Sequence, residues 1–135
     1  MGERAAKRNL RVGYEALAWG RFIYDYRDAW EVVRRAGQPN VGVILDSFHV
    51  LARGLEVASI QKIPPESIVM VQIADAPRLE MDYLAWSRHW RCLPGQGDLD
   101  LAGFMNALAR TGYDGVLSLE IFNDRFRAGS ARSVA

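Results

Sequence analysis

The sequence predicts an α/β fold with about four parallel strands and flanking helices. Short apolar runs alternate along the chain with amphipathic segments, which is the order of strands and helices in a parallel sheet. The apolar runs are nearly continuous, which is typical of strands that are buried on both faces. The chain has 135 residues, half of them hydrophobic and 24% charged, as expected of one globular domain.

The first strand and the first long helix lie in the first quarter of the chain. Residues 1–9 are expected to be the end of a helix or a disordered lead, and residues 11–17 a short strand. Residues 26–36 have apolar positions three and four apart, which predicts a helix. Asp25 or Asp28 is expected to cap its start, and the following glycine to end it.

Two buried strands are predicted in the middle of the chain. Residues 41–45 (VGVIL) and 68–73 (IVMVQI) are apolar runs of strand length. The segment between them is expected to contain a weak helix at 55–63, which ends at Pro64 and Pro65.

The last part of the chain predicts a loop, a helix and a final strand. Residues 78–96 are rich in aromatic and charged side chains, which indicates a functional loop with a helical turn or two. Residues 100–110 form an amphipathic helix, residues 116–121 (VLSLEI) the last strand, and residues 123–135 a polar tail.

Charge and cysteine content exclude several classes of protein. The 17 Lys and Arg against 16 Asp and Glu give a formal net charge of +1, so there is no electrostatic case for nucleic acid or an anionic membrane surface. The single cysteine, Cys92, excludes an intramolecular disulfide and a cysteine-rich zinc site. With no long apolar stretch and a polar, basic N-terminus, we expect a cytoplasmic protein.

Four polar side chains occur within or at the carboxyl ends of the four predicted strands: Glu15, Asp46, Gln72 and Glu120. Parallel strands bring such residues together, and buried carboxylates need a compensating charge. Oxygen ligands favour Mg2+, Mn2+ or a similar hard cation over zinc. Each acid taken singly could instead cap a helix or pair with an arginine. Four such positions on four successive strands are harder to explain in this way, so we expect a shared metal site.

Two histidines need separate interpretations. His49 follows Asp46 by three residues and is expected in the loop above the strand end, where it could carry a proton. The alternative is a surface or capping histidine. His89, between Arg88 and Trp90, is expected to make a loop contact.

The segment WSRHWRC supplies further polar groups. Ser87, Arg88 and Arg91 offer hydroxyl and guanidinium donors, and arginine is the usual partner of a substrate carboxylate. A solvated basic loop is the alternative. Asp75 either supports a metal ligand or forms a turn. Cys92 has no nearby base in the sequence and is not expected to be a nucleophile.

Four strand–helix units fit either a small open sheet or half of a (β/α)8 barrel, which usually needs about 250 residues. Five segments support the barrel: GYEALAWG, LDSFHVLARG, VQIADAPR, PGQGDLDLAGF and GYDGVLSLEIFND. Together they resemble the sugar phosphate isomerase/epimerase superfamily, the xylose isomerase-like TIM barrels. Within it they resemble the bacterial 3-dehydroshikimate dehydratases, which are often fused to a domain like 4-hydroxyphenylpyruvate dioxygenase. Gln72, where the wider superfamily commonly has a histidine, points to this branch.

The resemblance implies a reaction and its residues. It implies conversion of 3-dehydroshikimate to protocatechuate in quinate and shikimate catabolism, with a divalent metal, Mg2+ first and Mn2+ or Co2+ as alternatives. The implied metal ligands are Glu15, Asp46, Gln72 and Glu120. The resemblance also makes His49 the active-site histidine, and Ser87 and Arg91 the residues that contact the substrate.

The resemblance assigns residues 1–135 to strands five to eight of the family's barrel, which form its C-terminal half. An open half-barrel exposes two sheet edges and an apolar face, so we expect a homo-oligomer besides the small-molecule substrate. The alternatives are a metal-dependent sugar or sugar phosphate isomerase or epimerase, and an inactive half-barrel.

Overall fold

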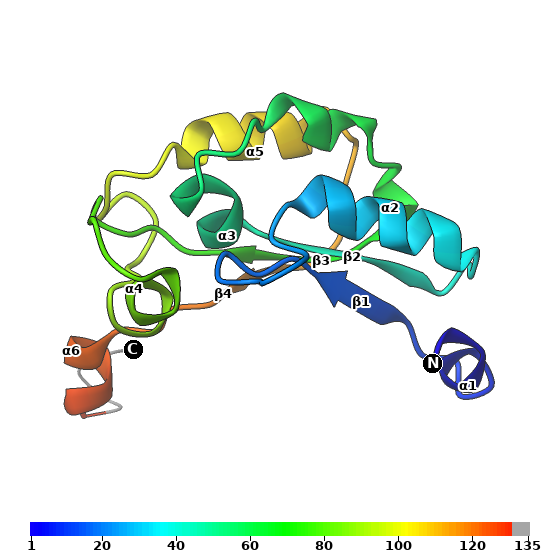
Figure 1. Ribbon diagram of the computed structural model, residues 1–135, viewed down its shortest axis with the longest axis horizontal. Helices are drawn as coiled ribbons and strands as arrows, with labels where there is room; N and C mark the ends of the chain where they lie inside the picture. Colours follow the sequence, from blue (N-terminus) through cyan, green and yellow to red (C-terminus); the bar gives the residue numbers. More distant parts are fainter. Residues whose placement is uncertain (131–135) are drawn as a thin grey trace.

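The computed structural model describes residues 1–130, which are built around a four-stranded sheet (Figure 1). All neighbouring strands are parallel, and their order follows the sequence. The strands are β1 (Val12–Glu15), β2 (Val41–Asp46), β3 (Ile68–Ile73) and β4 (Leu117–Leu119). The prediction of four parallel strands is confirmed. The two edge strands are shorter than predicted, because each has a pairing partner on one side only.

Three α-helices cover one face of the sheet: α2 (Tyr26–Ala36), α3 (Ser47–Ala52) and α5 (Leu101–Ala109) (Figure 1). The prediction for α2 is confirmed. The Asp25 carboxylate accepts a hydrogen bond from the Arg27 amide and caps the start, and Gly37 ends the helix with φ 59°. Asp28, the alternative cap, lies inside the first turn.

The core lies between the sheet and these helices. Strand side chains alternate between the two faces, so every second residue of β2 and β3 points toward the helices. Val43, Leu45 and Val71 lie on this face and are fully buried. Across the same pair of strands Asp46 is paired with Gln72, which places both on the opposite face at the carboxyl end.

Two predictions between β2 and β3 are wrong in detail. The weak helix expected at 55–63 is a 3-10 helix, η1 (Ala58–Lys62), and a second short one, η2 (Pro65–Ser67), follows. The loop expected around His49 is helix α3, because the Asp46 carboxylate accepts hydrogen bonds from the amides of Phe48 and His49 and starts a helix at once.

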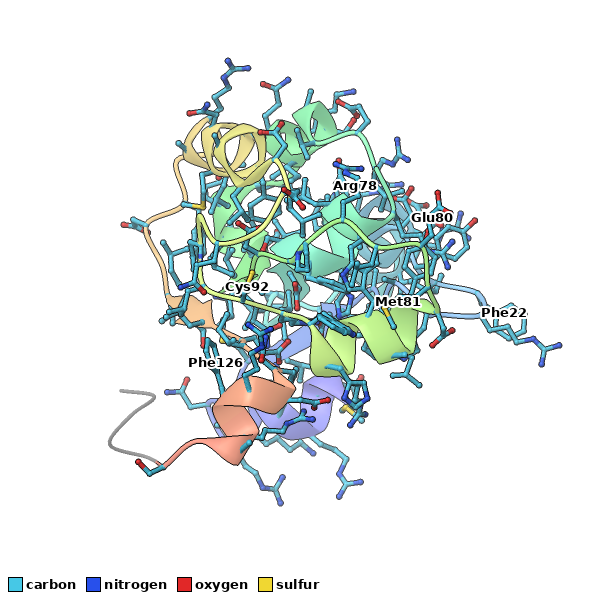
Figure 2. All side chains as sticks on the ribbon, turned by 90° about the vertical axis from the view of Figure 1, so that its left-hand side faces the viewer. Phe22, Arg78, Glu80, Met81, Cys92 and Phe126 are labelled. Carbon is cyan, nitrogen blue, oxygen red and sulfur yellow. The ribbon has the colours of Figure 1, made fainter. Side chains whose placement is uncertain are left out.

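Further helices lie at the two ends of the sheet. Helix α1 (Gly2–Ala6) lies beside the amino end, while α4 (Tyr83–His89) and α6 (Asp124–Ala128) lie at the carboxyl end (Figures 1 and 2). Helix α4 is the ordered part of the loop predicted at 78–96. The tail was predicted without a helix, but Asn123 caps α6 by accepting from the Arg125 amide. Residues 131–135 of that tail lie outside the described residues.

The second face of the sheet is bare in Figure 1. Strand β4 is also uncovered on its helix side, where Leu117 and Leu119 are 52% and 60% exposed. Val71 and Ile73, their partners on β3, are 0% and 7% exposed. Within residues 1–130, the structure contains no helix that is long and apolar enough to cross a membrane.

Candidate metal and substrate site

The side chains predicted at the strand ends meet at the carboxyl edge of the sheet. Glu15 is the last residue of β1, Asp46 the last of β2, and Glu120 follows β4. Gln72 Nε2 donates a hydrogen bond to Glu120 Oε1 at 2.7 Å. Arg91 Nη1 bridges Asp46 Oδ2 and Glu120 Oε2, at 2.7 Å from each. The sheet therefore brings these polar side chains into one cluster.

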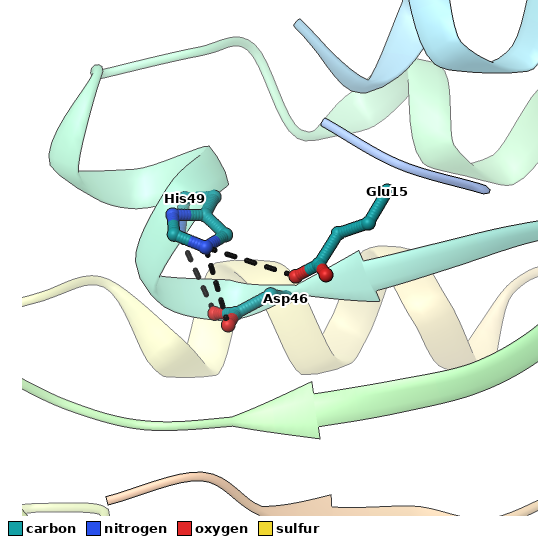
Figure 3. A group of neighbouring side chains, drawn as sticks. All are labelled: Glu15, Asp46 and His49. Atoms are coloured by element: carbon teal, nitrogen blue, oxygen red, sulfur yellow. Dashed lines mark hydrogen bonds and ion pairs between the residues drawn. The ribbon is translucent and has the colours of Figure 1, made fainter. Parts of the chain in front are cut away.

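Glu15, Asp46 and His49 form the tightest group in this cluster (Figure 3). His49 Nε2 lies 3.7 Å from Glu15 Oε1 and 3.7 Å from Asp46 Oδ2. One ligand atom of each residue lies within 4.8 Å of the other two, a spacing that one cation can span. The histidine belongs to this group although the sequence predicted it as a proton carrier beside the ligands.

Burial and like charges raise the pKa values of the acids. The pKa of Glu15 rises to about 7, first because the carboxyl is buried and then because Asp46 and Glu120 are near. The pKa of Glu120 is also raised, first by burial and then by Asp46, while Arg91 acts against the rise. A cation at this position would favour the ionised form of both carboxyls.

His49 is buried and neutral. Its Nδ1 accepts a hydrogen bond from the Ala18 amide at 3.2 Å, and its Nε2 faces Arg91 Nη2 at 3.2 Å. Burial and the Arg91 charge lower its pKa to about 3. The amide and the guanidinium are both donors, and a neutral ring has one acceptor nitrogen, so it can accept a hydrogen bond from only one of them. This burial excludes the alternative of a surface histidine.

Arg91 is more enclosed than the sequence predicted. It is 1% exposed, and its guanidinium is within hydrogen-bond distance of Ser87 Oγ through both Nε (3.1 Å) and Nη2 (2.9 Å). The Phe48 ring lies 4.7 Å from the guanidinium carbon. With its bonds to Asp46 and Glu120, Arg91 supplies part of the positive charge that the acids need. The alternative of a solvated basic loop is wrong for Arg91 and Ser87.

One buried atom at the site lacks a partner. Gln72 Oε1 is inaccessible to solvent and accepts no hydrogen bond, although its amide nitrogen is bonded to Glu120. A buried oxygen without a donor is costly, and such atoms are normally satisfied by protein, water or an ion. Together with three carboxylates, it makes a donor set that fits a hard divalent cation.

Other candidates lie outside the cluster. His89 Nδ1 contacts Asp124 at 2.9 Å on the surface, and Arg88 is exposed. The contact predicted for His89 is therefore a pair between α4 and α6. Burial raises the pKa of the Cys92 thiol to about 11, which agrees with its exclusion as a nucleophile. Asp75 is buried, and its carboxylate binds backbone amides.

Sequence reasoning missed two neighbours of His49. The Ala18 amide holds Nδ1, and the Trp19 ring meets the imidazole edge to face at 4.9 Å between centroids. Both come three to four residues after Glu15, in the loop that leaves the carboxyl end of β1. That position was the available signal, because such loops line the sites of parallel barrels.

Comparisons with known proteins agree with this geometry. The profile of the xylose isomerase-like TIM barrel family matches residues 1–135. The chain is 56% identical over all its residues to a 3-dehydroshikimate dehydratase of Pseudomonas putida, and covers 21% of that protein. It is 32% identical over 77% of its length to an inosose isomerase of Bacillus subtilis, of which it covers 37%. It thus spans about a fifth of the dehydratase.

Solved structures show the same fold. A xylose isomerase-like TIM barrel/4-hydroxyphenylpyruvate dioxygenase fusion protein matches 91% of the chain with a TM-score of 0.89 and 58% identity, and 20% of that protein is covered. The IOLI protein with a binding zinc atom matches 98% of the chain with a TM-score of 0.87 and 26% identity. The chain covers 47% of that structure, about half of one barrel.

Proposed function

The chain belongs to the xylose isomerase-like TIM barrel family, and we propose that it carries half of the active site of a metal-dependent 3-dehydroshikimate dehydratase. The relatives at 56% identity support this substrate over others in the family. The observation that carries the proposal is the carboxyl-end cluster, in which the buried Gln72 oxygen has no hydrogen-bond partner and the Gln72 amide nitrogen binds the Glu120 carboxylate.

A divalent metal is the first component of the proposal. Glu15, Asp46, Gln72 and Glu120 would hold it, and the zinc in the IOLI structure supports a divalent site in this fold. We propose Mg2+ first, with Mn2+ or Co2+ as alternatives, because the four ligands are oxygens. A bound cation would polarise the ketone of the substrate and acidify the neighbouring carbon.

Arg91 and Ser87 are proposed to bind the substrate carboxylate. The guanidinium is buried, so it is held by Ser87 and Phe48 in one orientation before a ligand arrives. When Asp46 and Glu120 are neutralised by a cation, the Nη1 hydrogens that they now share become available to another carboxylate.

His49 is proposed to move the proton. The reaction removes a proton from the carbon beside the ketone and expels a hydroxyl group, so that protocatechuate and one water are formed. A neutral imidazole would take the proton from the carbon beside the ketone at its free nitrogen, which leaves an imidazolium. The imidazolium would then deliver that proton to the departing hydroxyl, which leaves as water and returns the ring to its neutral form. The aromatic product makes the overall step favourable.

An isomerase or epimerase of the same family is the second candidate. The inosose isomerase relatives favour it, and its chemistry also begins with proton removal next to a carbonyl. Expulsion of the hydroxyl group distinguishes the dehydratase. A third candidate is an inactive half-barrel that still binds metal.

One assay separates these candidates. The purified chain is incubated with 3-dehydroshikimate and, separately, with a panel of ketoses and inososes, with added Mg2+ or Mn2+ and after chelation. Protocatechuate that forms only with metal supports the dehydratase, and interconversion of a ketose or inosose supports the isomerase. A folded chain that binds metal but has no turnover contradicts activity of this half-barrel, and the assay is then repeated with a full-length barrel.

We also propose a cytoplasmic location, because the single cysteine requires no oxidising compartment.

A second copy of the chain is the proposed protein partner. β1 and β4 lie at the two edges of the sheet, and Leu117 and Leu119 of β4 are exposed where the inner strands are covered. If β4 pairs with β1 of a second copy, two half-barrels complete eight strands and remove both open edges.

Light scattering tests this proposal. We expect twice the mass of one chain, and one chain mass for Leu119→Lys, with Leu84→Lys on exposed α4 as the control. A monomeric parent chain would contradict the proposal and would leave the second half of a longer chain as the partner.

A further inference from the structure

We infer that Asp75 is a positioning residue that holds Arg91 in the site through the backbone of Cys92. Asp75 follows β3 and is 2% exposed. The sequence left two interpretations open for it, support of a metal ligand or formation of a turn. The structure indicates support of Arg91. This role rests on the proposed function in one respect, which is that Arg91 is proposed to bind the substrate.

The Asp75 carboxylate is bound entirely by backbone amides. Oδ2 accepts from the amides of Gly95 (3.0 Å) and Gly97 (2.9 Å), and Oδ1 accepts from those of Ala76 (2.8 Å) and Leu99 (3.1 Å). Three of these donors belong to the segment PGQGDL, which lies about twenty residues further along the chain. One buried carboxylate therefore holds the turn PGQGDL in place through hydrogen bonds.

The glycines of this turn fit that role. Gly95 has φ 84°, a conformation that favours glycine. A Cβ on Gly97 would lie too close to Asp75 Oδ1 and to the carbonyl oxygen of Ala76. The turn PGQGDL is therefore shaped around a carboxylate of the same chain.

The backbone of Asp75 connects this turn to the site. Its amide donates to the Cys92 carbonyl at 3.0 Å, and its carbonyl accepts from the Cys92 amide at 2.8 Å. Arg91 precedes Cys92 directly, and its own amide donates to the Phe122 carbonyl at 3.0 Å. The Arg91 backbone is thus held between the Asp75 segment and the segment after β4. Figure 2 shows Cys92 inside the molecule, seen from the end that carries α4 and α6.

This arrangement fixes the backbone position from which the Arg91 side chain extends. Arg91 reaches Asp46, Glu120, Ser87 and His49 from a backbone that has no regular secondary structure of its own. When the Asp75 anchor is lost, the Cys92 segment is expected to loosen and the guanidinium to lose its single orientation.

Two readouts on Asp75→Asn test the inference without any turnover. An asparagine keeps the shape but presents an NH2 group to the amides of Gly95 and Gly97, two donors without an acceptor. The first readout is the rate at which a thiol reagent labels Cys92, which is 8% exposed in the parent. The second is hydrogen exchange of the Arg91 Nε–H in an NMR spectrum, where Arg91→Lys identifies the signal. Amides of α2 serve as an internal standard for global opening.

We expect both rates to rise about tenfold or more in Asp75→Asn while the α2 amides do not change. The control is Asp98→Asn in the same turn, where an exposed carboxylate accepts one bond from the Arg78 amide, and both rates should stay within about twofold of the parent. If Asp75→Asn does not fold, Gly97→Ala displaces the same carboxylate and should give the same pair of changes.

Two results would overturn the inference. Unchanged rates in Asp75→Asn would mean that the carboxylate anchors nothing. Faster Cys92 labelling with an unchanged Arg91 Nε–H would mean that Asp75 holds only the turn. Failure of the proposed dehydratase would appear as absent protocatechuate formation and would leave both readouts intact.

Discussion

Strand β2 carries two kinds of buried residue on its two faces. Leu45 points toward the helices and is 0% exposed, and its neighbour Asp46 points toward the site and is 2% exposed. Leu45 is surrounded by apolar side chains, whereas Asp46 shares Arg91 with Glu120 and lies near Glu15 and His49. Two side chains with almost equal burial therefore lie in an apolar and in a charged environment.

The two faces differ in what they contribute to stability. Burial of a side chain such as Leu45 stabilises the fold by about 1.5–3 kcal/mol. A buried ion pair such as Asp46–Arg91 is close to neutral overall, because desolvation of both charges offsets their attraction. The helix-covered face thus holds the sheet together, whereas the carboxyl-end cluster contributes little net stability. Substitutions on the two faces should separate stability from function.

The largest effect on function is expected at His49. His49→Ala removes the proposed proton carrier and should lower turnover of 3-dehydroshikimate by about 10²–10⁴-fold. Metal binding, measured by calorimetry with Mn2+, should be largely retained because the oxygen ligands remain. His89→Ala on the surface is the control and should change neither quantity. Loss of metal binding in His49→Ala would instead make the imidazole a ligand.

The next effect is expected at Asp46. Asp46→Asn keeps a good N-cap for α3 and removes the charge. We expect Mn2+ affinity to fall about 100-fold or more, since even outer partners of metal ligands account for 10–100-fold. Asp82→Asn, the same change at the exposed N-cap of α4, is the control. Equal Mn2+ affinity in Asp46→Asn and the parent would exclude Asp46 as a ligand.

Leu45→Ala should show the opposite pattern. The cavity that it leaves should lower the free energy of unfolding by about 2–5 kcal/mol, measured by urea denaturation. In the folded fraction, Mn2+ affinity should stay within about threefold of the parent, because Leu45 faces away from the site. Leu84→Ala on the exposed side of α4 serves as the control for stability. A large loss of affinity in folded Leu45→Ala would show that the two faces are coupled.

The smallest effect is the pH dependence that Glu15 confers. Its pKa is raised to about 7, so protons compete with the metal below that pH and the Mn2+ affinity should fall about tenfold per pH unit. Without metal, the folded chain binds more protons than the unfolded chain between about pH 4.5 and 7, so stability should decrease as pH rises through that window. In Glu15→Gln both slopes should flatten. Unchanged slopes would assign the titration to another group.

Much of this architecture was predictable, because it depends on local patterns. The run VGVIL and the spacing of residues 26–36 predicted β2 and α2 with almost correct bounds. The polar residues that end the strands predicted the cluster, because parallel strands share one carboxyl edge.

Other features were not predictable because they depend on contacts distant in sequence. Arg91 reaches Asp46 across 45 residues, and Asp75 binds a turn twenty residues away. Helix α3 was missed because six residues are too few to show a helical period, although Asp46 is a cap as well as a candidate ligand. The capping role was among the alternatives for each acid taken singly, but the sequence did not show that it applied to Asp46.

The carboxyl-end cluster is proposed to bind one divalent metal through its oxygens. Calorimetric titration of the folded chain with Mn2+ near pH 8, where Glu15 is ionised, tests it directly. We predict one ion per chain, displaced by excess Mg2+, with binding lost in Asp46→Asn and retained in Asp82→Asn. A folded parent chain that binds no ion, or that binds it equally well without the Asp46 charge, would contradict the claim.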